Sequence, residues 1–223
     1  MAFSYGWRGP NIVKDGLVLY LDPGSPNSYF NKSSTTIQDI SGNGYTGLLT
    51  NGPTFDSGNG GSIVFDGVND CIVVSSNANI LSKTSYTKIS WFYITSYLYN
   101  IISGGNSGAH AFWLGGTANL RAGHNGAWST VVSTTNLSLN TWYFGAVTFN
   151  TTNGWKLYVN GVQESTSVST TTYTGNDEIL VGAYSTGSNV FAGRIAVAQV
   201  YNKVLTDQEI LQNYNATKTR YGL

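Results

Sequence analysis

Short apolar and aromatic runs alternate with turn-forming residues along the sequence, which restricts the chain to folds built from many short strands. Ser, Thr, Asn and Gly supply 99 of the 223 residues, and they favour turns and hydroxyl-rich strand faces over long helices. The runs recur about every 8 to 15 residues, as in sandwiches and jelly rolls. The predicted strands are 16–22, 62–65, 71–74, 86–95, 99–103, 109–114, 128–133, 142–150, 155–160, 178–181 and 191–201.

Two turn signals predict hairpins. The segment Asp66-Gly67-Val68-Asn69 separates two apolar runs, and Asp, Gly and Asn adopt positive φ at little cost. Asn160-Gly161 follows a run in which apolar and polar residues alternate, which is typical of a type I′ turn between two strands. We therefore expect strand, turn and strand at each place.

The rest of the pattern is less regular. Residues 23–61 are dominated by turn formers, with short ordered segments expected only at 37–40 and 47–50. Near the C-terminus, Thr206 and Glu209 have the spacing of a capping box, in which each residue bonds to the backbone of the other. This spacing predicts one short C-terminal helix.

Charge is scarce and balanced. The chain has 11 basic and 11 acidic residues, and only 10% of its residues are charged, against about 25% in a typical domain. This composition disfavours nucleic-acid binding and electrostatic capture at a membrane. With 41% hydrophobic residues the chain can bury a large core. We expect an extended N-terminal arm (1–15), one β-sandwich domain (16–215) and a short tail (216–223).

Cysteine content and hydropathy limit the other options. Cys71 is the single cysteine, so an internal disulfide and a multi-cysteine zinc site are excluded. No basic stretch followed by an apolar run opens the chain, and no segment reaches the roughly 18 apolar residues of a spanning helix. We expect synthesis in a cytoplasm, with no classical export signal and no membrane insertion.

Six phrases occur in a characteristic order. They are Gly-Leu-Val-Leu-Tyr-Leu-Asp (16–22), Asp-Ile-Ser-Gly-Asn-Gly-Tyr-Thr-Gly (39–47), Gly-Ser-Ile-Val-Phe-Asp-Gly-Val-Asn-Asp (61–70), Trp-Tyr-Phe-Gly-Ala-Val-Thr-Phe (142–149), Trp-Lys-Leu-Tyr-Val-Asn-Gly (155–161) and the segment 193–210. The set resembles the laminin G-like jelly-roll domains of the concanavalin A-like lectin/glucanase superfamily over residues 16–215. The resemblance implies an all-β fold, an antiparallel β-sandwich of jelly-roll type with a short C-terminal helix.

The two ends of the chain carry a narrower resemblance. The opening at 12–22 and the ending at 211–218 are similar to the variety of this domain found in structural proteins of tailed bacteriophages, on tail fibres or as capsid decoration. This resemblance implies location in a virion, a homo-oligomer and contacts with other virion proteins.

Glycan recognition is a second possibility. Sugars present C–H faces to aromatic rings and hydroxyls to neutral polar groups. Arg121, His124, Asn125 and Trp128 supply these groups within eight residues, and Trp113 offers a second ring nearby in the sequence. The alternative for both tryptophans is a place in the core or at an oligomer interface.

A calcium site is a third candidate. Asp39, Ser41 and Asn43 place oxygen-bearing side chains at alternate positions before a glycine, as at the start of a calcium loop. The twelfth position of that loop would be Thr50, where an EF-hand has Glu. Members of the laminin G-like group often hold Ca²⁺ at a sandwich rim. Asp22 and Asp39 are the positions to test, although the resemblance gives no complete ligand set. The alternative is a simple Asx turn at Asp39.

Hydrolysis of a polysaccharide is a further alternative, since some relatives in the superfamily use paired carboxylates for it. The chain has three glutamates, Glu164, Glu178 and Glu209, and none lies in a Glu-x-Asp-x-Glu arrangement. We therefore expect no catalytic residues and no enzymatic activity, with glycoside hydrolysis kept as the remote alternative.

The first residues suggest assembly. Phe3, Tyr5 and Trp7 are interleaved with small residues in a segment that the sandwich does not need, so we predict an arm that orders on a partner; the alternative is a segment covering a sheet edge. The favoured function is a non-enzymatic virion structural protein. The alternative is a lectin-like adhesin that binds host surface glycans through the loops of residues 104–128.

Overall fold

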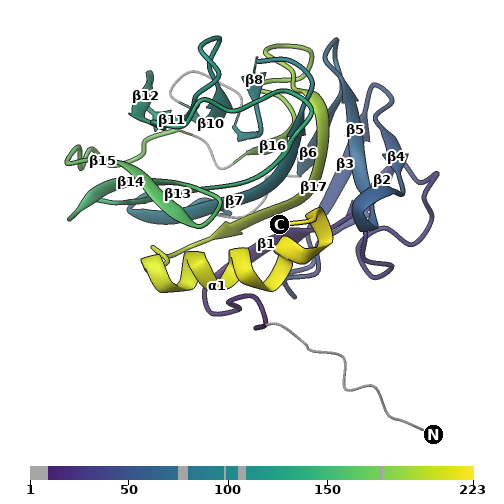
Figure 1. The fold of residues 1–223 in the computed structure, drawn as a ribbon, viewed down its shortest axis with the longest axis horizontal. Helices are drawn as coiled ribbons and strands as arrows, with labels where there is room; N and C mark the ends of the chain where they lie inside the picture. Colours follow the sequence, from purple (N-terminus) through teal and green to yellow (C-terminus); the bar gives the residue numbers. More distant parts are fainter. Residues whose placement is uncertain (1–9, 75–79, 98, 105–108, 176–177) are drawn as a thin grey trace, which may run out of the picture.

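The computed structural model describes residues 10–74, 80–97, 99–104, 109–175 and 178–223, which form three antiparallel sheets and one α-helix (Figure 1). The largest sheet has the order β15-β14-β13-β7-β17-β5-β4, and its eighth strand, β1, pairs with β17. The bounds are β1 (Leu17–Leu21), β4 (Thr54–Asp56), β5 (Ser62–Asp66), β7 (Ser85–Ile94), β13 (Trp142–Asn150), β14 (Gly154–Val159), β15 (Val162–Ser167) and β17 (Ala192–Tyr201).

The other two sheets are smaller. One has four strands in the order β12-β11-β10-β8, and the other has five in the order β2-β3-β6-β16-β9. The four strands are β8 (Tyr99–Asn100), β10 (His110–Leu114), β11 (Leu120–His124) and β12 (Ala127–Val132). The five are β2 (Thr36–Gln38), β3 (Thr46–Thr50), β6 (Cys71–Val74), β9 (Ile102–Ser103) and β16 (Ile179–Val181).

The sheets are arranged in layers. Figure 1 shows the two smaller sheets over one face of the large sheet, and the helix α1 (Asp207–Thr217) on its other face. The main core lies between the sheets. It includes Phe112 and Leu120 from the four-stranded sheet and Phe92 and Val147 from the large sheet. The predicted all-β jelly-roll sandwich with a short C-terminal helix is confirmed. No helix in the described part of the chain is long and apolar enough to cross a membrane.

One glycine lets the layers approach closely. A Cβ atom on Gly145, in β13, would lie 2.9 Å from Leu120 and 3.0 Å from Phe112. Without a side chain at this position, the inward residues of β10 and β11 pack directly on the backbone of the large sheet. The inner face of the four-stranded sheet is therefore close-packed against the large sheet.

The helix begins where the capping signal predicts. The backbone N–H of Glu209 donates to the hydroxyl of Thr206 at 3.2 Å, and the backbone N–H of Thr206 donates to the Glu209 carboxylate at 2.7 Å. This reciprocal pair satisfies two otherwise unpaired amides at the helix start. Ile210 is fully buried against the large sheet.

The last residues are part of the domain, so the predicted tail at 216–223 is wrong. A 3₁₀ turn, η2 (Lys218–Tyr221), continues from the helix. The Tyr221 ring stacks on Trp91 at 4.0 Å between centroids and lies 4.8 Å from Trp142. Arg220 donates to both carboxylate oxygens of Asp22, at 2.9 and 3.0 Å. Aromatic burial at the outer face explains why these residues are ordered against the sheet.

The predicted arm is shorter than expected. Val13 is buried, its N–H donates to the Asn213 side chain at 2.7 Å, and its carbonyl accepts from the Tyr201 hydroxyl at 3.0 Å. The segment from Pro10 onward therefore packs against the body instead of extending from it. Phe3, Tyr5 and Trp7 lie outside the described residues, so their role in assembly stays a prediction.

The predicted hairpin at Asp66–Asn69 is also wrong. The strand before this turn, β5, pairs with β4 and β17 in the large sheet, whereas the strand after it, β6, pairs with β3 and β16 in the five-stranded sheet. The turn carries the chain from one layer to the other, and the backbone N–H of Asp66 donates to the Asp70 carboxylate at 3.0 Å. Both strands are largely buried, so the alternation that accompanies a surface hairpin is missing.

Other local predictions are confirmed. Asn160 and Gly161 join β14 to β15, which pair antiparallel beginning at Val159 and Val162. The short segments expected within residues 23–61 form β2 and β3, but this stretch also contains β4 and the 3₁₀ turn η1 (Gly58–Gly60), which its turn-forming composition did not indicate. Strand β11 was not predicted, because Arg121-Ala122-Gly123-His124 contains neither an apolar run nor β-branched residues.

Both histidines of the chain lie buried under the four-stranded sheet. His110 and His124 are cross-strand partners on β10 and β11. Nε2 of His110 donates to the Glu178 carbonyl at 3.2 Å. Nδ1 can therefore accept a hydrogen bond from Nζ of Lys88, a buried residue of β7 in the large sheet. Burial lowers the pKa of His110 well below its usual range, and the nearby Lys88 lowers it further. Burial also lowers the pKa of Lys88 well below the usual lysine range.

The second histidine is arranged in the same way. Nε2 of His124 donates to the Thr171 carbonyl at 2.9 Å, and Nδ1 accepts from the Tyr86 hydroxyl at 3.1 Å. Both ring nitrogens are thus satisfied in the neutral form. Burial lowers the pKa of His124 from 6.5 to about 4.

We predict that acid destabilises the fold through these histidines. Below pH 6.5 the unfolded chain gains protons on His124, whereas the folded chain gains none until about pH 4, so the free energy of unfolding falls as the pH falls through this window. Between pH 7 and pH 4.5, His124 alone accounts for about 2 kcal/mol, and His110 adds to the loss. Urea unfolding at pH 7 and pH 4.5 measures the effect, with His124→Gln as the control that reduces it. Equal unfolding free energies at the two pH values would contradict this account.

Candidate functional site

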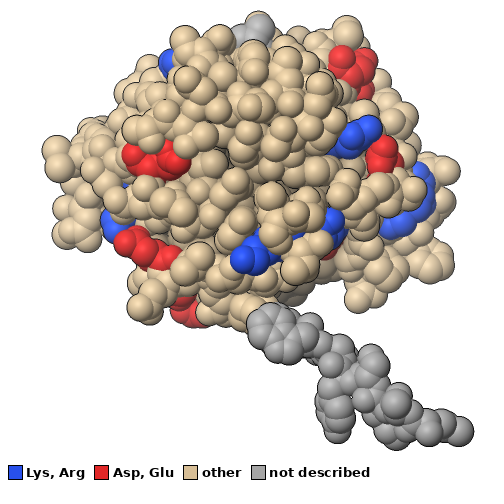
Figure 2. All heavy atoms as spheres, in the orientation of Figure 1, with Lys and Arg blue, Asp and Glu red and all other residues tan. Residues whose placement is uncertain are grey.

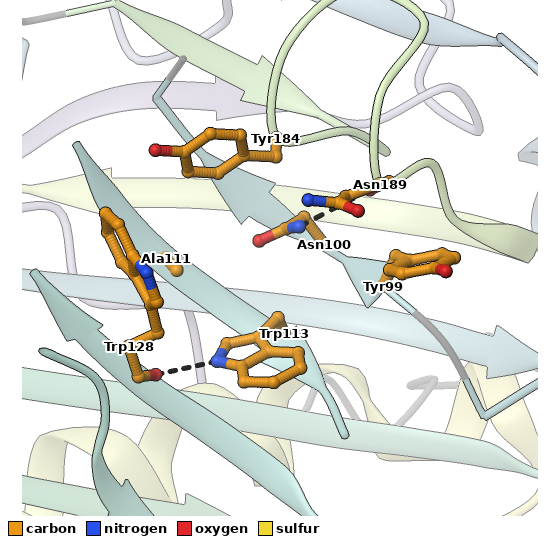
Figure 3. Close-up of a pocket in the computed structure, with 7 residues that line it drawn as sticks. All are labelled: Tyr99, Asn100, Ala111, Trp113, Trp128, Tyr184 and Asn189. Carbon is orange, nitrogen blue, oxygen red and sulfur yellow. Dashed lines mark hydrogen bonds between the residues drawn. The ribbon is translucent and has the colours of Figure 1, made fainter. Parts of the chain in front are cut away.

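A pocket of about 260 Å³ opens where the four-stranded sheet meets the turn that follows β16 (Figure 3). Strand β10 alternates, so that Phe112 points into the core while Ala111 and Trp113 face the other way, toward the pocket. Figure 3 shows two indole rings, two phenol rings and two amides around this space. The lining residues are Tyr99, Asn100, Ala111, Trp113, Trp128, Tyr184 and Asn189.

Trp113 is held in place by its strand neighbours. Its indole Nε1–H donates to the carbonyl of Trp128 at 2.7 Å, as the dashed line in Figure 3 marks. Arg121 is its cross-strand partner on β11, and the guanidinium carbon lies 5.4 Å from the Trp113 ring centroid. The hydrogen bond and the cation–π contact fix the ring at the pocket wall.

Trp128 reaches the pocket through an irregularity in strand pairing. The register between β11 and β12 shifts between Ala122 and His124. At the intervening Gly123 a Cβ atom would lie 1.7 Å from the carbonyl oxygen of Ala127, so only glycine permits this close approach. The Trp128 ring then makes an edge contact with Tyr184, with centroids 5.5 Å apart.

The polar side of the pocket is formed by two asparagines. The Asn100 side-chain amide donates to the backbone carbonyl of Asn189 at 3.3 Å, and its oxygen accepts from the Ser103 hydroxyl at 2.6 Å. Beside Asn100, Tyr99 has a φ of 125°, a strained conformation for a non-glycine residue and one that often accompanies a functional site. This backbone places the phenol ring at the pocket rim.

The structure separates the five residues predicted for glycan binding. Trp113 and Trp128 both line the pocket, and Arg121 supports Trp113 from the neighbouring strand. His124 is 3% exposed and serves the core, so it is removed from the candidate site. The Asn125 side chain accepts from the Thr174 N–H at 3.0 Å and donates to the Thr172 carbonyl at 2.8 Å. It therefore holds the segment 172–174 in place.

Besides Ala111, four aromatic or amide residues of the pocket were missed at the sequence level: Tyr99, Asn100, Tyr184 and Asn189. They belong to β8 and to the turn after β16, which the order of strands in the sheets brings next to β10. Tyrosine and asparagine are common throughout this chain, so no local signal marked these positions. The positive φ of Tyr99 is likewise invisible in the sequence.

The predicted calcium ligand Asp22 is already occupied. Its two oxygens accept from Arg220, its Oδ1 also accepts from the Gly24 N–H at 2.9 Å, and its Oδ2 accepts from the Tyr20 hydroxyl at 3.3 Å. A guanidinium supplies the positive charge that a calcium ion would otherwise bring. Asp22 therefore does not fit a calcium site.

The other predicted ligands form a turn. Oδ1 of Asp39 accepts from the backbone N–H groups of Tyr20 and Ser41, both at 2.8 Å, and Oδ2 accepts from the Ser41 hydroxyl at 2.7 Å. The Asn43 amide donates to the Val18 carbonyl at 3.1 Å. This is the Asx turn that was the alternative interpretation. Among the described residues no three His, Cys, Asp or Glu side chains gather in a group suited to a metal.

We predict that calcium does not change the stability of the protein. An ion that bound the folded state would raise the melting temperature, and the carboxylates at Asp22 and Asp39 are saturated by protein donors. Thermal unfolding in excess EDTA and in about 1 mM Ca²⁺ should give the same melting temperature. A higher value in Ca²⁺ would show that the ion displaces Arg220 or binds elsewhere.

Two of the three glutamates considered for hydrolysis, Glu164 and Glu209, have other partners. Burial opposes ionisation of Glu164, but hydrogen bonds from Thr134 and Thr135 outweigh it and lower the pKa of Glu164. Glu209 caps the helix. The pocket lining contains no carboxylate, whereas glycoside hydrolysis needs two that flank the scissile bond.

Residues 54–211 match the family model of the concanavalin A-like lectin/glucanases superfamily, in its laminin G-like form. The match runs from β4 into α1 and includes every strand that carries a pocket residue. The chain belongs to this superfamily. No curated protein matches the sequence, so the remaining similarities come from solved structures.

Three solved structures illustrate how widely this superfamily fold is used. Domain 4 of AbnA, an extracellular arabinanase from Geobacillus stearothermophilus crystallised with arabinotriose, is 16% identical with a TM-score of 0.71, over 89% of this chain and 98% of that one. The binding domain of Paraclostridial Mosquitocidal Protein 1 is 19% identical with a TM-score of 0.72, over 91% of this chain and 52% of that one. The sialidase of Trypanosoma rangeli, solved with sialic acid, is 16% identical with a TM-score of 0.65, over 92% of this chain and 33% of that one.

At these identities the likeness shows the shared fold. The chain spans nearly the whole of the arabinanase domain, about half of the toxin binding domain and about a third of the sialidase chain. In the last two, the region that shares this fold is therefore one part of a longer chain.

Proposed function

We propose that this protein binds carbohydrate, and that the pocket between β8, β10 and β12 is the binding site. The observation that carries the proposal is the convergence of Trp113, Trp128, Tyr99 and Tyr184 around the amides of Asn100 and Asn189. These side chains come from separate segments and meet at one half-open space. Aromatic walls with a few oriented polar groups are the usual composition of a small-ligand site.

The chemistry of the lining suits a sugar ring. A sugar has an apolar face of C–H groups that packs on aromatic rings and an edge of hydroxyls that both donate and accept hydrogen bonds. The two indoles supply the apolar surface, and the exposed amide of Asn189 supplies a donor and an acceptor, while the buried Asn100 amide is held by Ser103 and the Asn189 carbonyl. The volume of about 260 Å³ is near the lower end for ligand pockets, which favours one or two sugar units.

The comparisons are compatible with this proposal. The arabinanase domain was crystallised with arabinotriose, and the toxin domain is described as a binding domain. The pocket described above has aromatic and amide groups but no carboxylate, so it is suited to holding a sugar and not to cleaving it. We therefore propose a non-enzymatic, lectin-like role.

The direct test is Trp128→Ala. The variant removes one aromatic wall and should weaken glycan binding at least tenfold, about 1.4 kcal/mol, because the sugar face loses its contact surface. Trp128 is half-buried and is not part of the main core, so the melting temperature should change little. Binding is measured first on a glycan array and then by calorimetry with the strongest glycan.

Phe30→Ala is the matched control for this test. Phe30 is 86% exposed and does not line the pocket, so removal of its ring should leave glycan binding unchanged. Equal loss in the two variants would indicate nonspecific aromatic contacts. Unchanged binding by Trp128→Ala would place the sugar elsewhere.

A structural role in a virion, as capsid decoration or in a tail fibre, is a second candidate. Exposed apolar side chains favour protein contacts: Phe30, Val68 and Val168 are 86%, 70% and 92% exposed. Each of these side chains is available for contact with a copy of this chain or with another virion protein. The two roles are compatible, because a protein that decorates a particle can also bind glycans.

Deletion of residues 2–9 tests this second role. The deletion removes Phe3, Tyr5 and Trp7 but keeps Val13 and its contacts with the body. If these residues form an assembly arm, the variant should fold normally and fail to enter particles. Normal incorporation would contradict an assembly role for these residues.

A further inference from the structure

All seven side chains that line the pocket are uncharged. A ligand carboxylate buried there would lose its hydration and would need a cation or several N–H donors in return. The aromatic rings of the pocket carry no positive charge and few N–H groups. The scarcity of charge extends beyond the site, since Figure 2 shows only scattered charged side chains on the face in view.

One cation, Arg121, does lie beside the pocket, and its two terminal nitrogens each already donate to a protein hydroxyl. The guanidinium of Arg121 donates to the Thr117 hydroxyl at 2.7 Å and to the Ser129 hydroxyl at 3.4 Å, and it packs on the Trp113 ring. Its Nε atom is buried and has no hydrogen-bond partner among the described residues, and Arg121 does not line the pocket. A ligand carboxylate would have to compete with Thr117 and Ser129 for the terminal nitrogens of Arg121.

The amides show what the pocket offers instead. Asn100 is fixed by Ser103 and by the backbone of Asn189. The side chain of Asn189 is exposed, and it makes no hydrogen bond to any residue that the structure describes. It therefore has a donor and an acceptor available side by side, which match the acceptor and the donor of neighbouring sugar hydroxyls.

We infer that the pocket selects neutral, hydroxyl-rich sugars and discriminates against sugars that carry a carboxylate, such as sialic and uronic acids. This inference rests on the proposed function and adds its substrate class. Neutral hydroxyls that lose water can be satisfied by the amide, whereas a carboxylate loses more hydration energy and is left without a counter-charge.

The experiment compares matched neutral and acidic glycans on the full chain. An array carries oligosaccharides together with counterparts of the same linkage in which a neutral residue is replaced by its uronic acid, and it includes lactose beside 3′-sialyllactose. Calorimetry then gives affinities for the strongest pair, with Trp128→Ala as the measure of pocket dependence. We expect the neutral member to bind at least about tenfold more tightly, and Asn189→Ala to weaken it by about tenfold.

The outcomes separate this inference from the proposal on which it rests. Tighter binding of the neutral members than of their acidic counterparts, abolished by Trp128→Ala, supports both, whereas equal binding of the two overturns the selectivity alone. Tighter binding of the acidic members, also abolished by Trp128→Ala, keeps the carbohydrate-binding function and overturns the neutral selectivity. If no glycan binds in a Trp128-dependent way, the proposed function itself fails. Asn189→Lys adds the missing cation, and it should raise the relative affinity for the acidic members.

Discussion

The packing of the four-stranded sheet onto the large sheet is the constraint on which the pocket depends. Strand β10 can present Trp113 outward only because its alternate residues, including Phe112, are fixed inward. Gly145 lets that inner face sit on the large sheet without an intervening side chain. The rings of the pocket are thus supported by a close-packed layer, which lowers the entropic penalty of ordering them around a ligand.

The same layer contains an unusual polar cluster. Lys88, His110 and His124 are buried between the sheets, and the two histidines are held as neutral tautomers by carbonyl acceptors. Two of these groups lie on β10 and β11, the strands that carry Trp113 and its support Arg121. Protonation would place uncompensated charge in this layer, so the stability of the pocket's foundation is linked to pH. The cluster also explains why a histidine close to Trp128 in sequence points away from the ligand site.

Sequence reasoning recovered what local physics controls. Strand runs, the Asn160-Gly161 turn and the Thr206 cap are determined by neighbouring residues, and Trp113 and Trp128 stood out as aromatic groups near polar ones. The Asp66 turn was misread because its choice between hairpin and layer crossing depends on which distant strands pair with β5 and β6. Asn100 and Asn189 escaped notice for the same reason. Arg220 reaches Asp22 from the far end of the chain, which turned an expected calcium ligand into an ion pair.

The most direct measurement of the central claim is a titration followed through the indole N–H signals of the six tryptophans by NMR, with the neutral glycan that binds most tightly. The account predicts that the signals of Trp113 and Trp128, assigned by single substitution, shift in a saturable way with one dissociation constant. Trp91 and Trp155, buried in the core, should not move. Saturable shifts confined to tryptophans other than Trp113 and Trp128 would contradict a binding site in this pocket.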